Sequence, residues 1–95
     1  MGEREDKTWF RLMYQIIIAP KARKGLKTIT KIYRKGIAEA IDSLKDDPYL
    51  GKPLTRELTG KYSYKIGIYR IVYKINEKDK VVYIITAGHR ATVYE

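Results

Sequence analysis

The chain lacks several residue types on which whole classes of protein depend. It has no cysteine, which excludes a disulfide scaffold, a zinc site held by thiolates and a cysteine nucleophile. Its single histidine, His89, excludes a multi-histidine metal site, so we expect neither a metal nor another cofactor. No apolar run approaches the roughly 20 residues that a membrane span needs, and residues 1–9 are charged, unlike a secretory signal. These absences predict a cytoplasmic protein without a membrane segment.

Acidic residues are scarce as well. The chain has 20 Lys and Arg against 11 Asp and Glu, which gives a net charge of +9 on 95 residues. A field of that sign favours polyanions such as nucleic acid, the ribosome, an anionic membrane or an acidic protein. The alternative is a lysine-rich solvated surface of the kind found in thermophiles, which the single Gln and single Asn also fit.

The first half of the chain predicts one strand and two helices. Its length and a hydrophobic content of 44% suffice for one domain with a modest core. Branched residues over 14–19 predict a strand, and Pro20 suits the first turn of a helix over about 21–28. A second helix is expected over about 30–45, where one apolar stripe is formed by Tyr33, Ile37, Ala40, Ile41 and Leu44. Pro48 ends this helix, and the two helices are expected to form a hairpin.

The second half predicts strands. After a loop over 49–60, apolar residues alternate from Tyr62 to Ile75, with a phase slip at Gly67 that requires a bulge or a turn. A hairpin loop over 76–79 precedes a segment that is apolar on both faces and is predicted to be a central strand, over 80–87. Gly88 is expected to end that strand, and residues 90–94 to form a last short one.

The expected fold class is therefore α+β. Two N-terminal helices, as a helical hairpin, pack on one face of a small, mainly antiparallel sheet in the order β-α-α-β-β-β(-β). Residues 1–12 are expected to be a flexible N-terminal extension, and residues 13–95 a single domain.

Basic residues in or beside the strands are the candidate functional groups. Arg70 interrupts an otherwise apolar strand, so it either pairs with a carboxylate such as Glu57 or Asp47 or faces a groove. Arg90 follows the predicted central strand, where it could reach a site or be an ordinary surface arginine. Lys65 alternates with apolar neighbours, and a lone lysine in that place is usually solvated.

Two side chains could move a proton beside these cations. Tyr94 could act as a base because nearby cations favour the phenolate, or it could simply cover a sheet edge. His89 could exchange protons near neutral pH, or it could be bonded to backbone at the strand end. RNA carries its own nucleophile, the 2′-OH, so its cleavage needs only a base, an acid and cations on the phosphate. Tyrosines on an open sheet face could also stack on bases.

Several motifs, in this order, resemble the RelE/ParE toxin superfamily. Residues 14–26 look like the family's first strand and helix. The strongest likeness is in Gly51-Lys52-Pro53-Leu54, in the stretch from Tyr64 to Tyr73, and in Gly88-His89-Arg90 followed by Val93-Tyr94. The likeness covers about residues 13–95.

The resemblance implies the toxin of a type II toxin–antitoxin pair. RelE-like members cleave mRNA in the ribosomal A site without metal and leave a 2′,3′-cyclic phosphate. By this likeness Arg70 supports the transition state, Arg90 contacts phosphate, Tyr94 is the base, and Lys65 is the basic residue of its strand. The family commonly has a second lysine at the place of Gly67. The catalytic candidates are thus Arg70, Arg90, Tyr94, Lys65 and His89, and further RNA-binding candidates are Lys52, Arg56, Lys61 and Lys74.

The resemblance also implies partners. An acidic, partly disordered antitoxin of the RelB type would cover the basic face in a hetero-oligomer, and mRNA on the ribosome would be the other partner, with no membrane involved. ParE-like members share the fold, inhibit DNA gyrase and have no ribonuclease site. A non-catalytic toxin of that kind, an antitoxin-binding protein without nuclease activity, and a plain nucleic-acid-binding module therefore remain alternatives. Convergence of Arg70, Arg90 and Tyr94 on one open basic patch would favour the nuclease.

Overall fold

The branched residues near the start form a strand, and the two helices follow it as a hairpin. The computed structural model describes residues 13–89. Pro20 occupies the first turn of α2, where its missing N–H costs no hydrogen bond. The elements are β1 Gln15–Ile18, α2 Pro20–Lys27, α3 Lys31–Asp46, β2 Lys52–Pro53, β3 Lys61–Ile66, β4 Tyr69–Asn76 and β5 Val81–His89, with short 3-10 turns η1 Pro48–Leu50 and η2 Arg56–Leu58.

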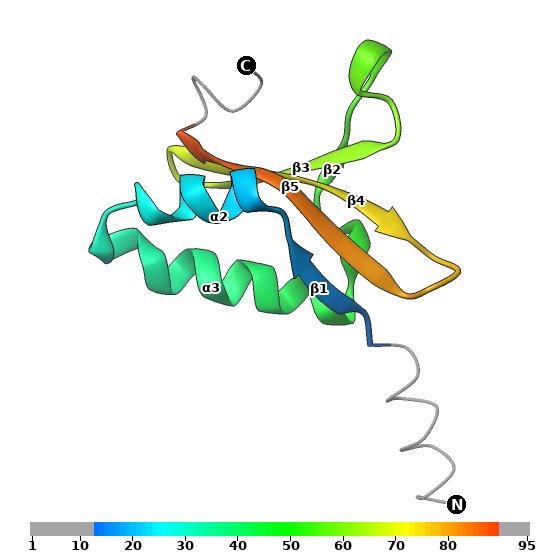
Figure 1. Cartoon of the computed structure of the whole chain (residues 1–95), viewed down its shortest axis with the longest axis horizontal. Coiled ribbons are helices and arrows are strands. Elements are labelled where there is room, and N and C mark those ends of the chain that lie inside the picture. The colour runs from blue at the N-terminus through cyan, green and yellow to red at the C-terminus, as the bar shows by residue number, and fades with distance from the viewer. Residues whose placement is uncertain (1–12, 90–95) are drawn as a thin grey trace, which may run out of the picture.

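The strands form one mixed sheet in the order β1-β5-β4-β3-β2, and α2 and α3 lie on one face of it (Figure 1). Strands β2, β3, β4 and β5 pair antiparallel, whereas β1 runs parallel to β5. The α2–α3 hairpin carries the chain from β1 at one edge of the sheet to β2 at the other edge. The antiparallel strands β2 to β5 then return across the sheet, and β5 ends beside β1. The prediction of an α+β fold with a helical hairpin on a mainly antiparallel sheet is confirmed.

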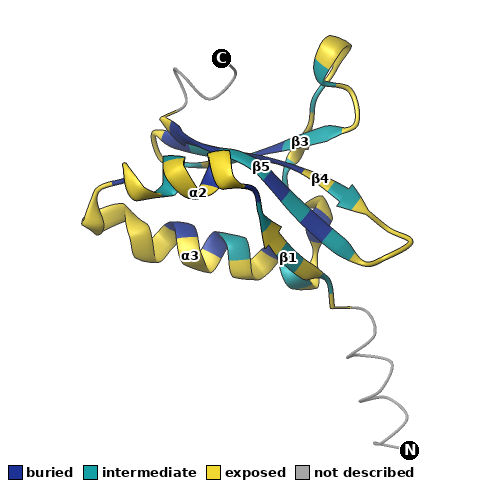
Figure 2. Ribbon diagram, viewed as in Figure 1, coloured by how far each residue is buried: buried dark blue, intermediate teal, exposed yellow. Residues whose placement is uncertain are grey.

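The core lies between the helices and the sheet (Figure 2). It contains Ala22 of α2, Leu44 of α3 and, from the sheet, Ile71, Tyr73, Val82, Ile84 and Ala87. Helix α2 approaches β5 so closely that a Cβ at Gly25 would overlap the carbonyl oxygen of Ala87. Gly25 therefore occupies a helix interior because no larger residue fits there, although glycine weakens a helix.

The phase slip at Gly67 is a turn. Gly67 and Ile68 connect β3 to β4, and Gly67 has a φ of +62°, which an L side chain rarely adopts. A residue with a side chain would be strained at this place. The irregularity of the sheet lies elsewhere, in the β4–β5 register between Val72 and Tyr73.

Two sequence expectations for the strands are wrong. The predicted loop over 49–60 contains the two-residue strand β2, which pairs with β3. The expectation that Gly88 ends β5 fails because the strand runs through it to His89. Strand β5 lies inside the sheet between β1 and β4, as predicted for a central strand, but only one of its faces is well buried: Val82 and Ile84 are buried, and Tyr83 is half-buried.

Predictions at the chain ends fall outside the described residues. These are the flexible extension over 1–12 and the last short strand over 90–94. None of the helices between residues 13 and 89 has the length and apolar character that crossing a bilayer requires.

Candidate functional site

The sheet has a basic side opposite the helices, which we call the open face. Successive residues of a strand point to opposite sides, and Tyr62, Tyr64 and Ile66 of β3 pack against the core. Their neighbours in β3 therefore point to the open face, as do the β4 residues paired with them. The residues so placed are Lys61, Ser63, Lys65, Arg70, Val72 and Lys74, with Lys52 beside Ser63 on β2.

Like charges lie directly opposite one another on this face. Lys65 pairs with Arg70, and Lys61 pairs with Lys74, across the β3–β4 ladder. Directly opposed like charges destabilise a sheet. The arrangement is suited to a polyanion that lies across both strands and removes the repulsion.

Three of the sequence-predicted residues share a groove. Lys65 and Arg70 of the sheet and Lys52 of the segment over 50–55 line a hollow of about 600 Å³. Arg70 is half-buried, whereas Lys52 and Lys65 are exposed. A guanidinium at the base of a groove with ammonium groups at its rim is a typical arrangement for holding a phosphate.

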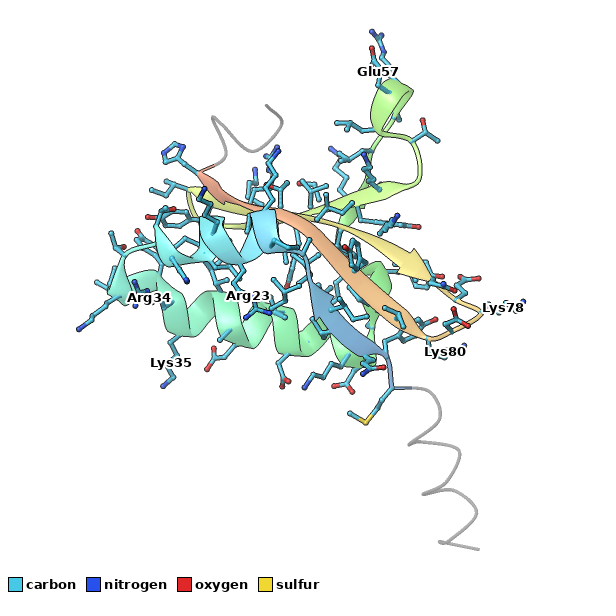
Figure 3. The ribbon with its side chains drawn as sticks, viewed as in Figure 1. Arg23, Arg34, Lys35, Glu57, Lys78 and Lys80 are labelled. Atoms are coloured by element: carbon cyan, nitrogen blue, oxygen red, sulfur yellow. The ribbon has the colours of Figure 1, made fainter. Side chains whose placement is uncertain are left out.

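The carboxylates considered as partners for Arg70 lie elsewhere. Glu57 lies at the tip of the β2–β3 connection, in η2 (Figure 3). The Asp47 carboxylate accepts a hydrogen bond from the Tyr49 N–H and caps η1. No acidic residue within 13–89 lines the groove, so its described walls carry positive charge only.

A buried tyrosine holds one wall of the groove in place. The Tyr73 hydroxyl donates to the Pro48 carbonyl oxygen at 2.7 Å and accepts from the Gly51 N–H at 2.9 Å. Burial, partly offset by the Gly51 hydrogen bond, raises the pKa of Tyr73 to about 12. The neutral phenol therefore ties η1 and the start of the wall to the centre of the sheet.

The other RNA-binding candidates lie outside the groove. Lys61 and Lys74 lie at the far end of the open face, and the Lys74 ammonium is 5.5 Å from the centroid of the Tyr83 ring. Arg56 is exposed in η2 with a φ of 59°, and it does not line the groove.

His89 lies toward the helix side. It pairs with Tyr69 across the β4–β5 ladder, and the two rings meet edge to face at 6.2 Å. Tyr69 packs against Ile29 and Ile37, so its side chain is on the helix face. The residue opposite Arg70 is Gly88, not His89. The sheet thus separates the imidazole from the groove, and Arg90 and Tyr94 lie outside the described residues.

Comparison with known proteins identifies the family of this chain. Residues 16–94 match the family described as the ParE toxin of the type II toxin–antitoxin system parDE. The chain is 34% identical over 83 residues to Toxin RelG of Mycobacterium tuberculosis, which covers 85% of this chain and 95% of that protein. This chain belongs to the RelE/ParE family of type II toxins. A second relative, Toxin RelE of the same organism, is 32% identical over 83 residues, covering 85% of this chain and 86% of that protein.

Solved structures of the family have the same fold as this toxin. The toxin–antitoxin complex RelBE2 of M. tuberculosis contains a chain with a TM-score of 0.75 and 32% identity, covering 82% of this chain and 99% of that one. The archaeal RelE–RelB complex of Pyrococcus horikoshii gives a TM-score of 0.68 at 26% identity, covering 85% and 99%. The intact E. coli RelBE complex, at 20% identity and a TM-score of 0.69, covers 80% and 95% and shares the fold.

Sequence reasoning found the cations of the toxin's groove but missed Tyr73. The sequence did indicate that Tyr73 needs a partner, because a tyrosine that points into the core must form a hydrogen bond with its hydroxyl group. That partner lies on a segment more than 20 positions away, which the local pattern does not reveal.

Proposed function

We propose that this toxin is an endoribonuclease that cuts mRNA on the ribosome, with the RNA backbone held across its open face. The single observation that carries the proposal is the convergence of Lys52, Lys65 and Arg70 on one groove whose described walls bear no acidic residue. A groove of this charge favours a phosphate at its base.

The proposed reaction uses the nucleophile that RNA supplies. A base removes the proton of the 2′-OH, the 2′-oxygen attacks the adjacent phosphorus, and the bond to the 5′-oxygen breaks. The products are a 2′,3′-cyclic phosphate and a 5′-hydroxyl, which receives a proton from an acid. Arg70 and Lys65 would stabilise the additional negative charge on the phosphorus oxygens, and Lys52 would hold the neighbouring backbone.

Tyr94 is the base in this proposal, by its match to the family's C-terminal tyrosine. The position of His89 supports this choice, since the imidazole lies on the helix side beside Tyr69 while Arg70 faces the other side. Arg90 is proposed as a second phosphate contact on the same ground of family likeness.

A RelB-type antitoxin is the proposed protein partner. The neighbours from M. tuberculosis and P. horikoshii are toxin–antitoxin complexes. A net charge of +9, with opposed like charges on the open face, would be complemented by an acidic chain that covers this face.

A ParE-like toxin that inhibits DNA gyrase without cutting RNA is the second candidate. Two observations favour it: the matching family is described by its ParE member, and Gly67 takes the place of a lysine common in RelE-like members. In this case the basic groove would bind antitoxin or DNA backbone rather than a reacting phosphate.

Cleavage of a translated mRNA on purified ribosomes, with divalent-metal dependence tested separately, decides between the two. We expect Arg70→Ala to lose about 10²–10³ in rate, as for removal of one well-placed cationic donor. Tyr94→Phe should lose activity while His89→Ala keeps it, and Lys35→Ala, on α3, serves as the charge-matched control (Figure 3). Growth arrest without cleavage, together with inhibition of gyrase supercoiling, would establish the ParE-like function instead.

A further inference from the structure

A row of side chains crosses the open face away from the groove, and the proposed reaction does not use its aromatic member. The strand registers place Lys61 opposite Lys74, Lys74 opposite Tyr83, and Tyr83 opposite Ile17. The row thus runs over β3, β4, β5 and β1, and we call it the Tyr83 row. Ile17 is 42% exposed, which is unusual for an isoleucine in a sheet.

Within the row a cation and an aromatic ring are in contact. The Lys74 ammonium lies 5.5 Å from the centroid of the half-buried Tyr83 ring. Ile17, Lys74 and Tyr83 line one hollow, of about 910 Å³. Two acidic residues of the β4–β5 turn, Glu77 and Asp79, also line it, and the Asp79 carboxylate accepts a hydrogen bond at 3.1 Å from the Asn76 side chain.

We propose that the Tyr83 row is a second nucleotide subsite for single-stranded RNA, in which a base stacks on Tyr83 and Lys61 and Lys74 hold the phosphates beside it. The choice of RNA as the ligand rests on the proposed function. Aromatic rings beside cations bind single strands without sequence preference, because every base has a flat face. Ile17 extends the apolar floor on which the base would rest.

The distance from the row to the groove suits a continuous strand. Lys61 and Lys65 are four residues apart on β3, and at about 3.3 Å per residue this separates the row from the groove by about 13 Å. Both sites lie on the same face, so an RNA backbone that follows β3 would pass from one cation pair to the other.

Binding to an RNA that cannot be cut tests the subsite apart from the reaction. The probe is a fluorescent 2′-O-methyl oligouridine, which has no free 2′-OH, and its affinity is measured by anisotropy at low salt. Inorganic polyphosphate serves as the base-free competitor. The variants are Tyr83→Leu, Tyr83→Phe and Lys74→Gln, with Lys35→Gln as the control on the helix side.

Stacking predicts a specific pattern. Tyr83→Leu should weaken oligouridine binding by about 5-fold or more and leave polyphosphate binding unchanged, because only the base needs the ring. Tyr83→Phe should bind like the original chain, and Lys74→Gln should weaken both ligands. An unaltered melting temperature in Tyr83→Leu excludes a folding defect.

Three results would overturn the subsite. They are unchanged oligouridine binding in Tyr83→Leu, equal losses for oligouridine and polyphosphate in that variant, and binding of an acidic peptide with the same dependence on Tyr83. Failure of the proposed function is a separate result: oligouridine binding that depends on Tyr83, with no cleavage of mRNA on ribosomes, would remove the nuclease and keep the subsite.

Discussion

Lys65 and Arg70 lie directly opposite each other on β3 and β4, on the side of the sheet that the helices leave uncovered. Two positive charges in this relationship repel, and the groove that they share contains no acidic residue in the described part of the chain to separate them. A negatively charged ligand that lies across both strands would relieve this repulsion, in keeping with the proposed function.

Removal of one member of this pair should therefore stabilise the toxin while it impairs function. We expect Lys65→Met, which keeps the length of the side chain, to raise the free energy of unfolding by about 0.2–1 kcal/mol at low salt. The gain should shrink as salt screens the repulsion. Denaturant unfolding at two salt concentrations measures this, and loss of stability in Lys65→Met would show that the lysine has a structural partner.

RNA binding to the open face should depend steeply on salt. The cations that face this side within the described strands are Lys52, Lys61, Lys65, Arg70 and Lys74. If each meets one phosphate of a single strand, the logarithm of affinity should fall against the logarithm of salt with a slope of about −3.5. Affinity should then drop about 100-fold between 50 and 200 mM salt. A slope near zero, measured with the 2′-O-methyl oligouridine, would rule out contacts to the backbone.

The sequence predicts the open face well because alternation along a strand is a local property. Arg70 and Lys74 each lie two residues from Val72 along β4, so all three side chains point to the same face of the sheet. The stripe of α3 was predictable for the same reason, since its period lies within one helix.

Properties that depend on pairing between strands could not be predicted. Whether His89 lies beside Arg70 or on the other side is set by the β4–β5 register, which shifts between Val72 and Tyr73. Strand β2 was missed because two residues, one of them proline, carry no period of their own. For the same reason the sequence did not predict the hydrogen bond between Gly51 and Tyr73, which joins segments 22 positions apart.

The Tyr73 phenol should ionise only in strong alkali and should lend the toxin stability that is lost there. Folding raises the pKa of this phenol from about 10 to about 12, so the folded state favours the neutral form. This contribution is complete below about pH 10 and disappears as the pH rises toward 12. Ultraviolet absorbance of phenolate, recorded against pH, should lose a step near pH 12 in Tyr73→Phe.

The same variant should be less stable at neutral pH. Tyr73→Phe leaves the Pro48 carbonyl and the Gly51 N–H without their hydroxyl partner, which costs about 1–3 kcal/mol. The wall of the groove should loosen too, so hydrogen exchange at the Gly51 amide should accelerate. Equal stability of the two proteins would mean that water replaces the hydroxyl at no cost.

Two glycines in the helices should respond in opposite directions to the same substitution. Gly25→Ala places a Cβ against the Ala87 carbonyl oxygen, where α2 packs on β5, and should destabilise by about 1–3 kcal/mol or more. Gly36→Ala, within α3, places a Cβ that meets nothing within 4 Å beyond its own helix backbone, and should stabilise by about 0.5–1 kcal/mol. Chemical denaturation of both variants measures the difference. Both substitutions lower the backbone entropy of the unfolded chain by a similar amount. If the two variants are equally stable, α2 can move away from the sheet without a loss of stability.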